Sequence, residues 1–322
     1  MMQIVCLDQN AASYLAVSNP KPVWREIKAA LGDGFRDRKL ICPLPFECVM
    51  ESAPKPLEFR KAIQTLFWLL SGGVAFKEFT EISSELTLAL IRPVPDWSPW
   101  NIWKPVWAEM EVAAQNVRAN WGSGKARMME RMNSFVRSSK VEGIPLREMF
   151  HAVAAQRSVW VCNDLDCLLN GRAAKESLHY PWLTEFLISS QLSPAEIEAL
   201  KRAVQHHGWA TIPIHAFEIM VGVKWEYDSI RGGSAKYAPN DEIDRTRAAI
   251  ALSYADVFIT EGDMANLCQK AKVNDFCPTV VLSVRNPQAI LDAVRAITHS
   301  KSPIGRPSAP KELGKLSNPF CS

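Results

Sequence analysis

The sequence lacks the cysteine pairs and the long apolar runs that mark several classes of protein. Its eight cysteines are scattered with no CxxC pair, so no structural zinc site is predicted. The most apolar stretch, 66–76, is too short to span a membrane and contains Ser71-Gly72-Gly73. The opening residues MMQIVCLDQN show no basic segment followed by a long apolar core, as a secretory signal would. We therefore expect a cytoplasmic protein with reduced thiols and no membrane partner.

Several catalytic motifs are also missing. The zinc-protease motif HExxH does not occur. The segment 122–125, GSGK, resembles part of a phosphate-binding loop, but Ala119 stands where the first glycine belongs and Ala126 where a serine or threonine belongs. No sequence period of about 20–50 residues recurs, which argues against a helical repeat array.

What remains is an ordinary globular composition, with 48% hydrophobic and 22% charged residues. These values exclude global disorder. A chain of 322 residues is long enough for one large domain or two ordinary ones. The net charge of +3 permits nucleic-acid binding but does not argue for it, since strong phosphate binders usually show a concentrated basic face.

Both ends of the chain show alternating strands and helices. Residues 3–8 form an apolar run that ends in Asp8, as expected of a buried parallel strand. A second strand is predicted at 39–44, and Pro45 begins a helix that carries Glu47 and Glu51 on one face. Further helices and strands are predicted near the other end of the chain; they are 11 onward, 23–31, 212–230, 257–259, 265–272, 279–284 and 287–298. This alternation predicts an α/β fold with a parallel sheet.

The middle of the chain has the apolar spacing of helices instead. The clearest such segments are 57–70, 83–91, 106–118, 125–136 and 194–206. The sequence therefore predicts an α/β core split between 1–54 and 205–298, a mostly helical insertion or cap at 55–204, and a flexible, proline-containing tail at 299–322.

Residues 240–263, NDEIDRTRAAIALSYADVFITEGD, contain the most suggestive group of acids. Asp241 and Asp244 fall in the first turn of a predicted helix, while Glu261 and Asp263 follow the end of the next strand. Asp8 also ends a strand, and the carboxyl ends of parallel strands meet at one edge of the sheet. Several carboxylates brought close together need a cation, and all-oxygen ligands suit Mg²⁺ or Mn²⁺.

These residues resemble the PIN-domain nucleases, and more closely their large bacterial variants than the small toxin nucleases. The resemblance covers about 1–54 and 205–298 and implies a three-layer α/β/α core that cuts RNA with a cluster of acids binding Mg²⁺ or Mn²⁺. A helix acid followed sixteen residues later by a strand-ending threonine matches Asp244 and Thr260. The resemblance implies that Asp8, Glu47, Asp244 and Asp263 hold the ion, with Glu51 as a competitor of Glu47 and Glu261 as the other candidate for the last acid. Glu261, Asp241 and Thr260 are the supporting residues.

Three of these acids also have an ordinary structural explanation. Asp8 and Asp241 are both suited to capping a helix, and Asp244 to completing a capping box. The basic run at 118–140 is either a solvated helix face or a surface for RNA phosphates, in which Lys125, Arg127 and Arg131 are the candidate contacts.

The resulting expectation is a metal-dependent endoribonuclease with RNA as its substrate. Two alternatives stay open: a non-catalytic PIN-like protein that binds a partner through the helical block, and a DNA nuclease or phosphatase that uses the same acids. An inhibitor protein or a second copy of the chain is a further possible partner.

Overall fold

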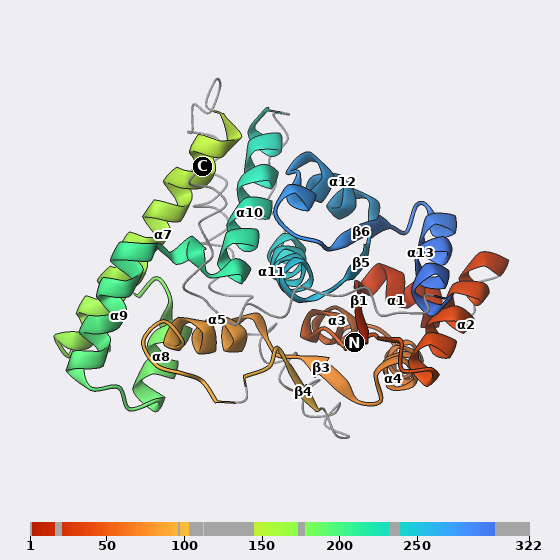
Figure 1. The fold of residues 1–322 in the computed structure, drawn as a ribbon, viewed down its shortest axis with the longest axis horizontal. Helices are drawn as coiled ribbons and strands as arrows, with labels where there is room; N and C mark the ends of the chain where they lie inside the picture. The colour runs from red at the N-terminus through yellow and green to blue at the C-terminus, as the bar shows by residue number, and fades with distance from the viewer. Residues whose placement is uncertain are drawn as a thin grey trace. The chain divides into compact units, whose positions relative to one another are not determined.

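The computed structural model describes most of the chain, in residues 2–16, 21–95, 97–102, 112, 145–172, 178–231 and 239–299. These residues divide into two compact units. Of the described residues, the first unit holds those within 2–77, 99–102, 112 and 239–299. The second unit holds those within 78–98 and 145–231. Figure 1 shows the elements of each unit along the chain.

The first unit is organised around a four-stranded sheet in which every pair is parallel. Its strands are β1 (Gln3–Leu7), β2 (Leu40–Ile41), β5 (Val257–Thr260) and β6 (Val280–Ser283), in the order β2-β1-β5-β6. The central pair joins distant parts of the sequence, since Val5 aligns with Val257 and Leu7 with Ile259. The predicted α/β fold with a parallel sheet is therefore confirmed.

Helices lie on either side of these strands in Figure 1, with α1, α2 and α13 on one side and α11 and α12 on the other. This arrangement is compatible with three α/β/α layers. The helices and 3-10 turn of the unit are α1 (Gln9–Ala16), α2 (Pro22–Arg36), α3 (Phe46–Ser52), α4 (Leu57–Ser71), α11 (Pro239–Tyr254), α12 (Gly262–Lys270), η2 (Val273–Asp275) and α13 (Pro287–His299). A separate antiparallel pair, β3 (Val74–Phe76) and β4 (Trp100–Ile102), completes the unit.

The two central strands, β1 and β5, are apolar because both of their faces are covered, whereas the edge strand β6 is only partly buried. Ile4 to Leu7 are all buried, and so are all four residues of β5. Alternate residues on one face, Val5 and Leu7 with Val257 and Ile259, join a core cluster with α1, α2 and α13. This continuous burial explains why β1 and β5 appear in the sequence as short apolar runs rather than as alternating patterns.

In the described part of the second unit every named element is a helix. These elements are α5 (Phe79–Leu88), α7 (Leu146–Leu169), α8 (Pro181–Ser189), α9 (Pro194–His207), η1 (Trp209–Thr211) and α10 (Pro213–Arg231). Helix α9 begins as predicted: Ser193 and Glu196 form a reciprocal capping box, and Pro194 takes the first helical position.

The unit boundaries fall elsewhere than the predicted domain boundaries. Helix α4, predicted within the insertion, belongs to the unit that contains the sheet, whereas α10, predicted with the α/β core, belongs to the helical unit. The predicted helices at 106–118 and 125–136 and the predicted tail from residue 300 lie outside the described residues. Among the described helices, none is long and apolar enough to cross a membrane.

Strand β2 and helix α2 have bounds that differ from the predicted ones. The predicted strand 39–44 is reduced to the two residues of β2, although Leu44 still forms an isolated bridge to Ala75. Helix α2 does not end before Gly32 but continues to Arg36, through Gly32 and Gly34. Gly34 is needed there because an added Cβ would lie 2.7 Å from Leu40 and 2.9 Å from Thr298.

The two glycines of α2 therefore make a matched pair for a stability test. Gly34→Ala is expected to lower the free energy of unfolding by about 1–3 kcal/mol, because the new methyl group has no space beside buried Leu40. Gly32→Ala meets nothing within 4 Å and is expected to raise it by up to about 1 kcal/mol through helix propensity. Urea unfolding of both variants measures the difference, and equal effects would contradict the close packing of α2.

Candidate functional site

Asp8 occupies the carboxyl end of β1 and is completely buried. One carboxylate oxygen, Oδ1, accepts a hydrogen bond from the Ala11 backbone N–H at 2.7 Å, so Asp8 caps helix α1. The other oxygen, Oδ2, accepts from the Thr260 hydroxyl at 2.7 Å and from the Glu261 backbone N–H at 2.6 Å. Because β1 and β5 are parallel neighbours, their carboxyl ends lie side by side, and Asp8 joins the two ends.

Glu261 lies directly after β5, with its side chain half-buried. Its Oε2 accepts a hydrogen bond of 2.9 Å from Asn10 Nδ2 in the first turn of α1. Thr260 is 1% exposed, so its hydroxyl is fixed between the sheet and Asp8. The two predicted residues Thr260 and Glu261 are thus in direct contact with Asp8.

A second pair of acids lies on α3 and α11, joined by an arginine. The Arg247 guanidinium donates through Nη1 to Glu51 Oε2 at 2.6 Å and through Nη2 to Asp244 Oδ1. The side chains are 5% exposed for Arg247, 15% for Glu51 and 18% for Asp244. This is a largely buried ion triad that crosses from one helix to the other.

The charges of the two groups of acids shift one another's pKa values. Burial raises the pKa of Asp244 to about 7; Arg247 opposes this rise, and the charges of Glu51, Glu261 and Asp8 add to it. The pKa of Glu261 is also raised, first by burial and then by the neighbouring Asp8. Burial by itself would lower the pKa of Arg247, but the carboxylates beside it raise the pKa well above its usual value. Four carboxylates therefore share one region, and their negative charge exceeds the charge of the Arg247 guanidinium.

The charges of Glu47, Asp8 and Arg247 all act on the thiol of Cys6, whereas Asp263 and Asp241 are less buried. Glu47 is buried in the first turn of α3, and its charge acts on Cys6 of β1. Asp263 is 81% exposed and pairs with Arg285 at 2.8 Å, while Asp241 is half-buried near the start of α11. The predicted RNA contacts Lys125, Arg127 and Arg131 lie outside the described residues.

The donors suit a hard divalent cation in their chemistry. Asp8, Glu51, Asp244 and Glu261 offer only oxygen ligands, as Mg²⁺ and Mn²⁺ require. The neighbouring Gln9 is 8% exposed, and within the described residues its amide atoms Nε2 and Oε1 have no hydrogen-bond partner. In the described part of the chain, however, no three histidine, cysteine, aspartate or glutamate side chains converge as a metal-holding group. The donor chemistry fits a cation, and the guanidinium of Arg247 provides positive charge among these acids.

Arg247 is the residue of this site that the sequence prediction missed. The signal was present, because an arginine three residues after Asp244 on one helix is placed for an ion pair. What the sequence did not contain is the second contact, since Glu51 lies 196 residues away on α3. A charge on a helix face is normally assigned to solvent, whereas this one is buried by the packing of α3 against α11.

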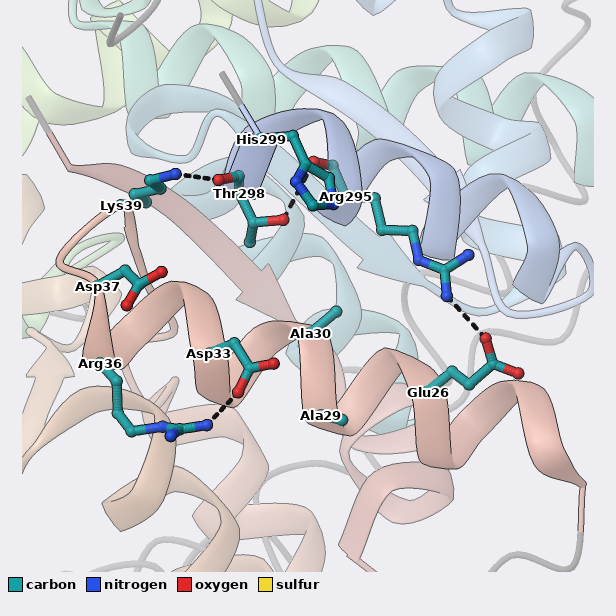
Figure 2. A pocket seen from close by; sticks show the side chains of 10 residues that line it. All are labelled: Glu26, Ala29, Ala30, Asp33, Arg36, Asp37, Lys39, Arg295, Thr298 and His299. Atoms are coloured by element: carbon teal, nitrogen blue, oxygen red, sulfur yellow. Dashed lines mark hydrogen bonds and ion pairs between the residues drawn. The ribbon is translucent and has the colours of Figure 1, made fainter. Parts of the chain in front are cut away.

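A cavity of ≈ 560 Å³ lies at the opposite edge of the sheet, between α2 and α13. Lys39, one of its lining residues, precedes β2 and accepts a hydrogen bond from Gln3 at the amino end of β1. Figure 2 shows two ion pairs in its lining, one between Arg36 and Asp33 and one of 2.8 Å between Arg295 and Glu26. This cavity is therefore distinct from the acidic region around Asp8.

Comparison with known proteins adds no assignment to this geometry. No protein-family model, no curated protein and no solved structure matches the chain. The arrangement at the ends of β1 and β5 is therefore the main guide to function.

Proposed function

We propose that the chain is a metal-dependent endoribonuclease with a PIN-like core, which hydrolyses RNA phosphodiester bonds at the carboxyl ends of β1 and β5. The observation that carries the proposal is the contact of Asp8 with Thr260 and Glu261, within the same electrostatic region as Asp244 and Glu51. Acids from four separate elements supply charge to this one region, as expected of a site for a cation and a phosphate.

Each residue has a distinct task in this proposal. A bound Mg²⁺ or Mn²⁺ would supply an activated water and neutralise charge on the phosphate. Asp8, Asp244 and Glu261 would hold the ion, with Glu51 as the neighbouring acid. Thr260 keeps the Asp8 carboxylate oriented through its hydroxyl, and the partly exposed Glu261 leaves the site open to a substrate from solvent.

The test is cleavage of labelled single-stranded RNA by the purified full chain with Mn²⁺, Mg²⁺ or a chelator. Glu261→Gln and Asp244→Asn are each expected to reduce the rate by roughly a hundredfold or more, since each removes a charged oxygen ligand. Asp292→Asn, on an exposed turn of α13 whose carboxylate pairs with Gln288, is the matched control and is expected to cleave at the rate of the unchanged protein.

The same experiment separates the alternatives. Cleavage of single-stranded DNA or of a phosphate monoester without cleavage of RNA would assign the site to the DNA nuclease or phosphatase alternative. Asp263→Asn decides between the two acids after β5: a loss as large as that of Glu261→Gln would bring Asp263 into the site. No cleavage of any substrate, together with no metal-dependent shift of the thermal midpoint, would overturn the proposal.

One observation favours the non-catalytic alternative, a protein that keeps a PIN-like core and binds a partner. Arg247 already compensates part of the negative charge of Glu51 and Asp244. A site whose charge is partly compensated by its own arginine depends less on a metal to remain folded. This alternative predicts that chelators change neither the thermal midpoint nor any binding activity of the chain.

A further inference from the structure

Arg247 is a buried arginine with two carboxylate partners. Its guanidinium contacts carboxylates on two different helices, Glu51 on α3 and Asp244 on α11, and its side chain is 5% exposed. The two carboxylates form a cation site, and the planar guanidinium of the same chain occupies it.

The same carboxylate that Arg247 engages is needed for a metal ion. Asp244 is one of the acids that share a region with Asp8 and Glu261, and a divalent cation at this place would need its oxygens. Two cations cannot both take the full negative charge of one carboxylate in a largely buried space without strong mutual repulsion. Arg247 and a metal ion therefore compete for Asp244.

We propose that Arg247 is the resident counter-ion of the acidic site and that a divalent metal binds by displacing it from Asp244. This inference rests on the proposed function, because it assumes that the acids bind a metal. Glu51 keeps hold of the guanidinium during the exchange, so the arginine stays nearby and returns when the metal leaves. The exchange makes metal affinity weak and tunable, and the folded chain is stable without metal.

The first test is the affinity of the purified full chain for Mn²⁺, measured by the loss of the free-Mn²⁺ electron paramagnetic resonance signal. Arg247→Met is expected to bind Mn²⁺ at least about tenfold more tightly than the unchanged protein, because a competing unit charge at ion-pair distance is gone. Arg295→Met removes an arginine from the exposed pair with Glu26 at the other edge of the sheet. It is the matched control, and its affinity for Mn²⁺ is expected to equal that of the unchanged protein.

A second variant keeps the test decisive if Arg247→Met fails to fold. Arg247→Lys retains the charge but replaces the fork by a single ammonium, which cannot hold Glu51 and Asp244 in the same geometry. Its affinity for Mn²⁺ is expected to lie between those of the unchanged protein and Arg247→Met, a few times tighter than the former.

The outcomes distinguish this inference from the proposed function. Equal and measurable Mn²⁺ affinities in the unchanged protein and in both variants at Arg247 would overturn the exchange but leave a metal site. Weaker binding in both variants would show that Arg247 supports the metal rather than competes with it, which also overturns the exchange. Absence of Mn²⁺ binding in every protein would overturn the inference together with the metal dependence of the proposed nuclease.

Discussion

Asp8→Ala is expected to lower the free energy of unfolding by about 3–5 kcal/mol, because it leaves three donors without their acceptor. The Ala11 N–H loses its helix cap, and the Thr260 hydroxyl and the Glu261 N–H lose a buried carboxylate. Urea unfolding of the purified variant, in chelator so that no metal contributes, measures the change.

An opposing effect has to be weighed against this loss. The charge of Asp8 raises the pKa of both Asp244 and Glu261, so its removal also relieves repulsion within the cluster. Hydrogen bonds to a buried charged group stabilise by about 1.5–3 kcal/mol each, and three of them outweigh the relief of one like charge that Arg247 partly screens.

Asp8→Asn separates the two effects. The amide oxygen can still accept from Ala11, but the amide NH₂ group then faces the Thr260 hydroxyl and the Glu261 N–H, and at least the latter can only donate. We expect a loss of about 1–3 kcal/mol for this variant. A rise in stability for Asp8→Asn would show that like-charge repulsion dominates and that the cluster is strained in the absence of a cation. It follows that Asp8→Asn alone is a poor test of catalysis, since it alters the fold as well as the charge.

The strand ends of this site were predictable from sequence, because buried parallel strands appear as short apolar runs. Asp8 after QIVCL and Thr260 at the end of VFIT could be assigned to one sheet edge before any contact was known. The hydrogen bond from the Thr260 hydroxyl to Asp8 agrees with that expectation. Local pattern was sufficient here, since only strand type and strand direction had to be correct.

Which of the two acids after β5 lies against Asp8 depends on backbone direction, which the sequence does not reveal. Glu261 and Asp263 both follow β5, and helix α12 begins between them, at Gly262. The Glu261 N–H donates a hydrogen bond to Asp8. Asp263 lies two residues later, in the first turn of α12, and forms an exposed ion pair with Arg285. A similar limit applies to Glu51, whose contact with Arg247 exists only because α3 packs against α11.

The second unit contains a different buried ionisable group, His215 of α10, which makes its stability dependent on pH. His215 is 2% exposed, its Nε2 lies 2.9 Å from Ser83 Oγ, and its ring stacks on Trp209 with centroids 3.9 Å apart. Burial lowers the pKa of His215 well below 6.5, and the positive charge of Arg157 on α7 lowers it further. The nearby Glu218 is paired with Arg157 at 3.5 Å.

The sign of the effect follows from which state binds the proton. Below pH 6.5 the unfolded chain protonates this histidine, whereas the folded chain keeps it neutral. The stability contributed by neutral His215 is therefore complete above 6.5 and is lost as the pH falls toward its folded-state pKa. Each pH unit within that window costs about 1.4 kcal/mol.

Acidification is thus expected to destabilise the helical unit in particular, and His215→Gln is expected to remove most of this dependence. Glutamine does not titrate, and its amide can keep a hydrogen bond to Ser83. Hydrogen exchange of amides in the described part of α7 and α10, at about pH 7 and about pH 5 with correction for the intrinsic rates, measures the local free energy of opening.

Because glutamine fills the space beside Trp209 less well than an imidazole, His215→Gln should be less stable than the unchanged protein at neutral pH, by about 1–3 kcal/mol. The two proteins should then approach each other as the pH falls. His206→Gln, at the exposed end of α9, controls for the loss of a histidine as such. Parallel pH profiles for the unchanged protein and His215→Gln would contradict the prediction, because they would place the acid-sensitive group elsewhere than between Ser83 and Trp209.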